Sequence, residues 1–312
     1  MRAVVFDRFG PPDVLHVAQL PSPVAGEGEV LVKVAAATVN PTDLMMRSGQ
    51  QAKAMIGLEP PFIAGMEFAG YVHALGGRSS RLEPGQAVMG IVNPRRSQGG
   101  AHCEYVCVPE ASVVPTPEGL DIVSAATLPM NGLTASMALQ ALALSAGATL
   151  LVTGGAGALG GYVIQMARHM GLHVIADAKE QDRDLLARLG ATELVPRGEG
   201  MAASIRVNHA AGVDGLVDAA LIGNAAAAVV RDGGVVVSVR RTQVIDTQRL
   251  KAAYIGVLEQ ATNTEALASI ADLAREGAIT PRVAQILSFD HAADAHRLLE
   301  QGGLKGRIVL VP

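Results

Sequence analysis

Residues 151–180, LVTGGAGALGGYVIQMARHMGLHVIADAKE, carry the clearest signal of the fold. An apolar run ends in glycines, a helical pattern follows, and a second apolar run stops at charged residues. Gly155-Ala156-Gly157-Ala158-Leu159-Gly160 matches G-x-G-x-x-G between a predicted strand at 149–153 and a predicted helix at 159–170. The first glycine permits a tight turn, the second lets backbone N–H groups approach a pyrophosphate, and the third lets helix and strand pack closely. These six residues are predicted to bind a dinucleotide, and the alternative is a glycine-rich turn in an α/β domain without a ligand.

The end of the second predicted strand, at 173–177, bears on which dinucleotide binds. An acidic residue there binds the adenosine ribose of NAD, whereas basic residues accept the extra phosphate of NADP. Asp177 favours NAD, while Lys179 and Arg183 favour NADP, although a solvated lysine at a helix start also explains Lys179. We predict NADPH as the preferred cofactor, with NADH as the alternative.

The predicted secondary structure differs before and after about residue 115. Up to about residue 115, short β-branched or alternating runs predict strands at 3–6, 29–34, 65–75, 86–91 and 101–108. After that point, helical segments alternate with apolar strands, which predicts a parallel sheet with helices on both faces. A helix at 294–300 and a strand at 307–311 are predicted to close the chain.

Composition narrows the classes of protein. The 312 residues exceed one ordinary domain, so two are expected. A net charge of −4, with no Lys/Arg cluster longer than a pair, argues against a nucleic-acid partner. Residues 122–167 carry no charge, but Pro129 and the glycines from Gly154 interrupt them, so buried helices and strands explain this run better than a membrane span. Two cysteines and no visible signal peptide predict a reduced, cytoplasmic setting.

Several motifs in a fixed order resemble the medium-chain dehydrogenase/reductase superfamily, and within it the zinc-independent quinone oxidoreductases. They are VNPTDLMMRSG (39–49), PFIAGMEFAGYV (61–72), GGAHCEYVCVPE (99–110), LPMNGLTA (128–135), LVTGGAGALGG (151–161) and GRIVLVP (306–312). The resemblance implies a Rossmann doubly wound parallel sheet at 119–262. It also implies a split, partly β-barrel (GroES-like) catalytic domain at 1–118 and 263–312, an active site in the cleft, and a homodimer.

The same resemblance places Asn40, Met66 and Met130 where zinc alcohol dehydrogenases of the superfamily hold their catalytic metal. An amide and two thioethers are not the N, S and O ligands that Zn²⁺ takes. The four-cysteine structural zinc lobe is absent, and the eight histidines are scattered without an HExxH motif. The chain is therefore predicted to bind no metal.

In related reductases, the asparagine of the VNP motif and the threonine of GLTA lie near the nicotinamide, which implies this position for Asn40 and Thr134. Asn40 could instead cap the helix that begins at NPTD, and Thr134 could be an ordinary helix-start residue. Gly223 and Arg240 follow apolar runs, so their loops are predicted at the strand ends where ligands bind in parallel sheets. A solvated Arg240-Arg241 pair is the alternative.

One departure from the resemblance concerns the proton donor. Well-known quinone reductases often carry a tyrosine shortly after the N-P-x-D motif, where this chain has Leu44-Met45-Met46. Met45, Met46 and Met66 could form an adaptable apolar pocket wall or pack in the core. The proton donor and the physiological substrate therefore stay open.

The residues and the resemblance together predict a reaction class. Alcohol oxidation needs a Lewis acid for the developing alkoxide, whereas quinones and activated alkenes are better electrophiles that hydrogen-bond donors can assist. We expect a zinc-independent, NADPH-dependent oxidoreductase that transfers hydride to a small quinone or conjugated carbonyl. The alternatives are an alkenal or enoyl-thioester reductase acting on a C=C bond, and a catalytically quiet nucleotide-binding protein.

Overall fold

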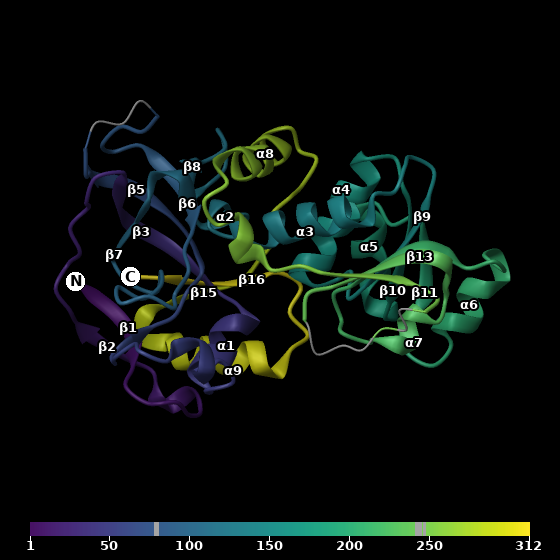
Figure 1. Ribbon diagram of the computed structural model, residues 1–312, viewed down its shortest axis with the longest axis horizontal. Coiled ribbons are helices and arrows are strands. Elements are labelled where there is room, and N and C mark those ends of the chain that lie inside the picture. The colour runs from purple at the N-terminus through teal and green to yellow at the C-terminus, as the bar shows by residue number, and fades with distance from the viewer. Residues whose placement is uncertain (78–80, 241–244, 246–247) are drawn as a thin grey trace. The chain divides into compact units, whose positions relative to one another are not determined.

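A computed structural model describes residues 1–77, 81–240, 245 and 248–312. The chain divides into two compact units, which differ in architecture (Figure 1). The first unit comprises Met1–Met130, Leu258–Gly277 and Pro281–Pro312, and the second comprises Asn131–Val257 and Ala278–Thr280. Both ends of the chain thus build the first unit. The domain boundaries predicted at 118/119 and 262/263 remain predictions beside the unit boundaries at 130/131 and 257/258.

The second unit is built on a parallel sheet. Its strands are β9 (Thr149–Thr153), β10 (His173–Ala178), β11 (Glu193–Pro196), β12 (Val213–Asp218), β13 (Val230–Ser238) and β14 (Lys251–Tyr254). They lie in the order β11-β10-β9-β12-β13-β14, and every neighbouring pair is parallel. The direction of winding reverses between β9 and β12, which is the point at which open parallel sheets bind ligands. This confirms the predicted Rossmann sheet.

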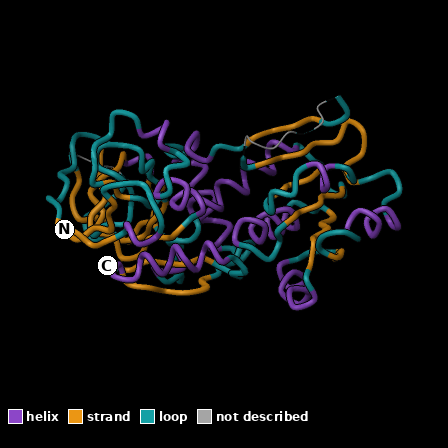
Figure 2. The backbone as a smooth tube through the Cα atoms, turned by 90° about the horizontal axis from the view of Figure 1, so that it is seen from below, coloured by secondary structure: helices purple, strands orange, loops and turns teal. Residues whose placement is uncertain are grey.

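Helices follow the strands of the second unit in turn. They are α3 (Pro129–Leu142, which begins at the unit boundary), α4 (Ala158–His169), α5 (Arg183–Leu189), α6 (Met201–Asn208) and α7 (Asn224–Ala227), with a short 3-10 turn η4 (Glu180–Asp182). Helix α4 packs against β9 and β10, and α5 packs against β10 and β11. Figure 2 shows these helices and strands alternating along the backbone. The uncharged run at 122–167 is thereby accounted for by packed elements that are mostly buried.

The first unit is predominantly antiparallel. A small sheet has the order β2 (His16–Gln19), β1 (Arg2–Phe6), β4 (Phe62–Ile63). The larger sheet has the order β15 (Val283–Ser288), β16 (Arg307–Val311), β3 (Glu29–Val39), β5 (Glu67–Leu75), β6 (Ala87–Ile91), β8 (Val113–Pro115), with β7 (Tyr105–Pro109) also paired to β3. Strand β16 pairs with β3 through Ile308 and Val39, so the C-terminal strand completes a sheet begun near the N-terminus.

The remaining helices of the first unit are short except for two. They are α1 (Pro41–Arg47), α2 (Ile122–Ala125), α8 (Thr264–Arg275) and α9 (Ala292–Gln301), with 3-10 turns at Pro12–Val14, Ala52–Met55, Glu110–Ser112, Val257–Gln260 (whose first residue belongs to the second unit) and Phe289–His291. The strand predicted at 101–108 begins only at Tyr105. The residues before it bond elsewhere, because the N–H groups of Ala101 and His102 donate to the carbonyls of Gly65 and Ala64 at 3.0 Å each.

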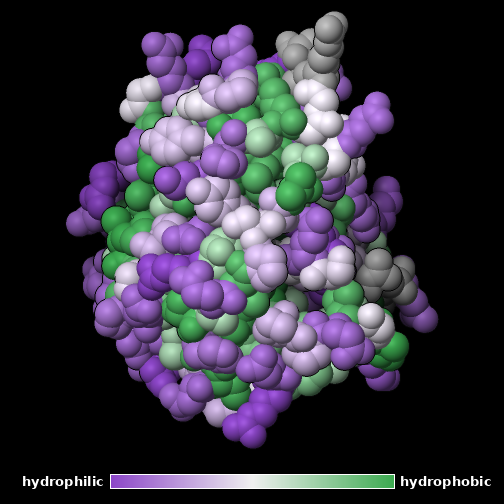
Figure 3. Space-filling model, turned by 90° about the vertical axis from the view of Figure 1, so that its left-hand side faces the viewer, coloured by the Kyte–Doolittle hydropathy of each residue, from purple (hydrophilic) through white to green (hydrophobic). Residues whose placement is uncertain are grey.

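The surface and the helix lengths bear on the membrane question. Hydrophilic side chains are spread over the face that Figure 3 shows, with smaller hydrophobic groups between them. Within the described parts of the chain, no helix has the length and apolar character needed to span a bilayer.

Candidate functional site

The glycine turn, which we define as Gly154–Gly160, connects β9 to α4. Gly154 has a φ of +67°, in the left-handed region, so it provides the tight turn that the sequence pattern assigned to Gly155. Its N–H donates to Asp177 Oδ1 at 2.6 Å, and its carbonyl accepts the N–H of Gly157 at 2.9 Å. The turn is therefore held both by the second strand and by its own backbone.

The three motif glycines differ in what a side chain would meet. A Cβ on Gly155 would lie 2.7 Å from Ile164 Cδ1, and one on Gly160 would lie 2.4 Å from the carbonyl oxygen of Gly154. A Cβ on Gly157 would meet only that carbonyl oxygen, at 3.2 Å. Packing of the protein thus explains glycine at two positions, whereas at Gly157 the space beside the backbone stays open.

Backbone amides at the start of α4 follow Gly157 directly in the chain. Ala158, Leu159 and Gly160 form the first turn of a 12-residue helix, whose N–H groups have no partners within the helix. No acidic residue lies in that turn, and the helix dipole favours an anion there. The residues at this site therefore fit a diphosphate.

Charged residues next to the glycine turn bear on the cofactor. Asp177 is buried; one carboxylate oxygen accepts from Gly154, and the other forms an ion pair with Arg197 Nε at 3.0 Å. Lys179 and Arg183 have exposed side chains beyond the end of β10. Sequence reasoning missed Arg197. Ala178 is paired with Pro196 across β10 and β11, so Arg197 follows β11 at the level where Lys179 follows β10.

Gly223 and Arg240 lie at the same edge of the sheet, because they follow the carboxyl ends of the parallel strands β12 and β13. The N–H of Gly223 donates to Asp218 Oδ2 at 2.7 Å, and Thr153 donates to the other oxygen of that carboxylate at 2.6 Å. Arg240 is exposed, and its backbone N–H donates to Ser238 Oγ at 3.2 Å. Its predicted partner Arg241 lies outside the described residues.

Asn40 belongs to the first unit, in a buried group that we call the polar cluster: Thr38, Asn40, Glu67 and Arg307. Arg307 donates to Asn40 Oδ1, to Thr38 Oγ1 at 2.8 Å and to Glu67 Oε1 at 2.6 Å. Asn40 Nδ2 lies 3.1 Å from Thr38 Oγ1 and 3.2 Å from Glu67 Oε1. The second oxygen of Glu67 accepts the backbone N–H of Met130 at 2.8 Å.

Asn40 also caps a helix, which is the alternative role predicted for it. Asn40 is the N-cap residue of α1, and its backbone N–H donates to Asp43 at 2.7 Å. The same carboxylate accepts the N–H of Gly65 at 3.0 Å. Burial raises the pKa of Asp43, while nearby His102 and these two hydrogen bonds act in the opposite direction. Asp43 therefore orients the start of α1.

The other residues of the predicted reaction centre are also buried or half-buried. Thr134 is 7% exposed and lies on α3 in the second unit. Met46 packs in an apolar core with Val4 and Phe6, so of its two alternatives, pocket wall or core, this residue takes the core. Met45 is half-buried on α1. The roles of Asn40 and Thr134 at a nicotinamide remain predictions.

Two protein-family models match separate parts of the chain. The family model for the alcohol dehydrogenase GroES-like domain matches residues 26–118, and the zinc-binding dehydrogenase model matches residues 189–310. A solved "probable oxidoreductase" from Mycobacterium abscessus is 30% identical, with a TM-score of 0.86 over 100% of this chain and 99% of that one. The chain belongs to the medium-chain dehydrogenase/reductase superfamily.

Other relatives place this medium-chain dehydrogenase/reductase among the quinone-oxidoreductase-like proteins. The quinone oxidoreductase from Coxiella burnetii is 29% identical, with a TM-score of 0.89, covering 100% of this chain and 99% of that one. The NADPH-dependent alkenal/one oxidoreductase of Arabidopsis thaliana is 28% identical over 100% of this chain and 80% of its own length. The resemblance seen in the sequence is confirmed, and the chain is an oxidoreductase of this superfamily.

The second family model raises the question of zinc, and the residues at the catalytic zinc positions do not fit the metal. The amide of Asn40 is engaged by the polar cluster, and the sulfur of Met66 accepts the Thr42 hydroxyl at 3.1 Å. Glu67, next to Met66, is fully committed to Arg307, Thr38 and the amide of Met130. These positions therefore do not provide a catalytic zinc site.

Proposed function

We propose that this chain is an NADPH-dependent reductase of quinones or conjugated carbonyls that acts without a catalytic zinc. The observation that carries the proposal is the glycine turn, where Gly157 leaves the backbone open at the switch point of a parallel sheet. The names of similar proteins, a quinone oxidoreductase and an NADPH-dependent alkenal/one oxidoreductase, support the same reaction class.

The glycine turn would hold the diphosphate of the cofactor through the N–H groups of Ala158, Leu159 and Gly160. When bound, the reduced nicotinamide supplies the hydride, and the protein supplies orientation and a dry site. Lys179, Arg183 and Arg197 would hold the extra phosphate of NADPH. The ion pair between Arg197 and Asp177 supports this assignment, because it offsets a carboxylate that would otherwise repel the phosphate.

The two residues predicted at the reacting end differ in what they can offer. Because the side-chain nitrogen of Asn40 already lies near two acceptors, we assign Asn40 to positioning rather than to hydrogen-bond donation. Thr134 is the hydroxyl that we place beside the nicotinamide. The homodimer expected from the resemblance stays a prediction.

A substrate panel with both nicotinamide cofactors tests the reaction. With NADPH we expect rapid oxidation by 1,4-benzoquinone, unchanged after EDTA treatment of protein that stays folded, because no metal takes part in hydride transfer. Turnover of a short 2-alkenal or an enoyl-CoA with the quinone inert would favour the C=C reductase, which the name of the Arabidopsis relative also supports. Inertness toward every substrate in folded protein would identify a quiet nucleotide-binding protein and overturn the proposal.

Cofactor preference is tested by removing the proposed phosphate ligands. Lys179→Ala with Arg183→Ala, and separately Arg197→Ala, should each weaken NADPH binding by roughly tenfold or more, since hydrogen bonds to charged groups contribute about 1.5–3 kcal/mol. NADH binding should hardly change. The matched control is Arg188→Ala, which removes another exposed cation of α5. An unchanged ratio of NADPH to NADH affinity would remove these residues from phosphate recognition.

A further inference from the structure

Three metal-ligating side chains meet at the edge of the parallel sheet opposite the glycine turn. His173 begins β10, Glu193 begins β11, and His209 is the C-cap residue of α6. We call them the His/Glu cluster. Ile175 is paired with Glu193, and His173 lies two residues earlier, so the two side chains project from the same face of neighbouring strands. Their wide spacing along the chain hid this group from sequence analysis.

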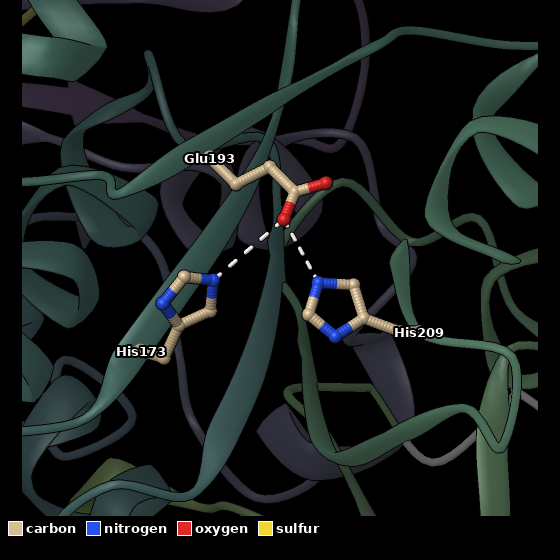
Figure 4. A group of neighbouring side chains, drawn as sticks. All are labelled: His173, Glu193 and His209. Carbon is tan, nitrogen blue, oxygen red and sulfur yellow. Dashed lines mark hydrogen bonds and ion pairs between the residues drawn. The ribbon is translucent and has the colours of Figure 1, made fainter. Parts of the chain in front are cut away.

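The side chains of the His/Glu cluster point toward one another (Figure 4). His209 Nε2 lies 2.8 Å from Glu193 Oε2, and His173 Nε2 lies 3.6 Å from the same oxygen. The three potential ligand atoms all lie within 4.8 Å of one another. Ligands about 2.0–2.1 Å from a tetrahedral Zn²⁺ are about 3.3 Å apart, so the two contacts to Glu193 need shifts of a few tenths of an ångström, and the two histidine nitrogens need to move by no more than about 1.5 Å.

The hydrogen bonds of Thr192 fix the state of the His173 ring. The Thr192 hydroxyl donates its one hydrogen to the carbonyl of Val174 at 2.8 Å. Toward His173 Nδ1, at 3.2 Å, it can therefore only accept, so Nδ1 carries the hydrogen. In the neutral ring, Nε2 then presents a lone pair to the Glu193 carboxylate, and Nε2 has no hydrogen-bond partner among the described residues. Two acceptors that face each other in this way are satisfied by a proton on Nε2 or by a metal ion between them, and the third ligand group beside them, His209, favours the metal ion.

Neighbouring groups also prepare Glu193 as a ligand. Asn208 donates to Oε1 at 3.2 Å, which leaves Oε2 for the two histidines. Hydrogen bonds of this kind to the outer side of metal ligands fix their orientation and strengthen binding.

We propose that the His/Glu cluster binds one divalent transition-metal ion of the Zn²⁺ class, with two imidazoles and one carboxylate as ligands and water in the remaining position. Imidazole and carboxylate together suit zinc and its first-row neighbours rather than Mg²⁺ or Ca²⁺. Such an ion would tie the starts of β10 and β11 to the end of α6 and stabilise the second unit. This site lies apart from the catalytic zinc positions, and it departs from the sequence-based prediction that the chain binds no metal.

Calorimetric titration of Zn²⁺ into EDTA-treated, desalted full-length protein tests the site. We expect one equivalent to bind and the thermal unfolding midpoint to rise. His173→Gln, Glu193→Gln and His209→Gln should each abolish both effects, and Thr192→Val should weaken binding by about 10- to 100-fold. His169→Gln removes an exposed histidine of the same unit and should change neither.

Absence of Zn²⁺ binding to the wild-type protein, or equal binding to the three ligand variants, would overturn the proposal. Should those variants fail to fold, the visible absorption of the wild-type protein with Co²⁺ still decides the matter. Intense bands of tetrahedral Co²⁺ are expected with imidazole ligands, and their absence at saturating Co²⁺ would rule the site out.

Discussion

The polar cluster of the first unit and the glycine turn of the second differ in whether their hydrogen-bonding groups are paired within the protein. In the polar cluster, Arg307 and Glu67 bond to each other, to Thr38 and to Asn40, all of them buried. In the glycine turn, the first amides of α4 have no partners within the helix, and a Cβ on Gly157 would meet only the carbonyl oxygen of Gly154 among the described residues. Groups whose bonds are satisfied inside the protein stabilise the fold, whereas open groups are ready for a ligand.

This difference predicts two separate kinds of mutational effect. Changes in the polar cluster should lower the free energy of unfolding, and changes at Gly157 should lower cofactor affinity while the fold persists. A polar-cluster variant that lost only cofactor affinity, or a Gly157 variant that lost mainly folding stability, would contradict this difference.

The largest effect is expected for Gly157→Val. The side chain would occupy the approach to the helix amides, and losing two hydrogen bonds to a charged diphosphate costs roughly 3–6 kcal/mol, or about 100-fold or more in affinity. Gly157 has φ −73° and ψ 174°, which valine adopts readily, so the free energy of unfolding should fall by no more than about 1 kcal/mol. Calorimetry with NADPH and urea unfolding measure the two quantities.

Gly160→Val is the matched control for this variant. Its Cβ would lie 2.4 Å from the carbonyl oxygen of Gly154 and 2.8 Å from Gly155 Cα, so the turn itself must distort. We expect a clear loss of folding stability in Gly160→Val. If Gly157→Val destabilised the protein as much, the space beside Gly157 would not be open.

A slightly smaller effect, on stability, is expected for Arg307→Met. The change leaves the buried carboxylate of Glu67 without its cationic partner, which costs about 3–5 kcal/mol. Arg297→Met serves as the control because Arg297 pairs with Asp294 and Asp13 on the surface, and exposed pairs contribute at most about 1 kcal/mol each. Chemical unfolding of both variants compares them, and equal losses would contradict the assigned role of the polar cluster.

The smallest effect concerns His296, a buried histidine of α9 whose ring nitrogens have no partner in the described part of the chain. Burial, together with nearby His102 and Arg47, lowers its pKa well below 6.5. Above pH 6.5 the ring is neutral in the folded and in the unfolded protein. Below pH 6.5 the unfolded chain takes up a proton that the folded protein does not. The free energy of unfolding therefore falls by up to about 1.4 kcal/mol per pH unit as the pH is lowered. His296→Phe should flatten this fall in urea unfolding between pH 7.5 and 5.5, and an unchanged slope would exclude His296 as its source.

The parallel sheet and the glycine turn could be predicted from sequence because their signals are local. Periodicity and turn chemistry located β9, α4 and β10 to within a residue or two. Even there, the left-handed turn residue is Gly154 rather than Gly155, because backbone angles depend on how the turn meets Asp177.

Contacts between distant segments could not be predicted in this way. Arg307 meets Asn40 only because β16 pairs with β3, and Arg197 meets Asp177 only through the register of β10 and β11. The His/Glu cluster has the same origin. Pairing between strands leaves no trace in residue spacing, whether the strands are far apart in sequence, as β3 and β16 are, or consecutive, as β10 and β11 are.

The most direct test of the central claim, that the glycine turn holds a nicotinamide dinucleotide, is a calorimetric titration of the folded wild-type protein with NADPH and with NADH. We expect saturable binding of one molecule per chain, tighter for NADPH than for NADH. If neither dinucleotide bound to protein that still unfolded cooperatively, the claim would be wrong.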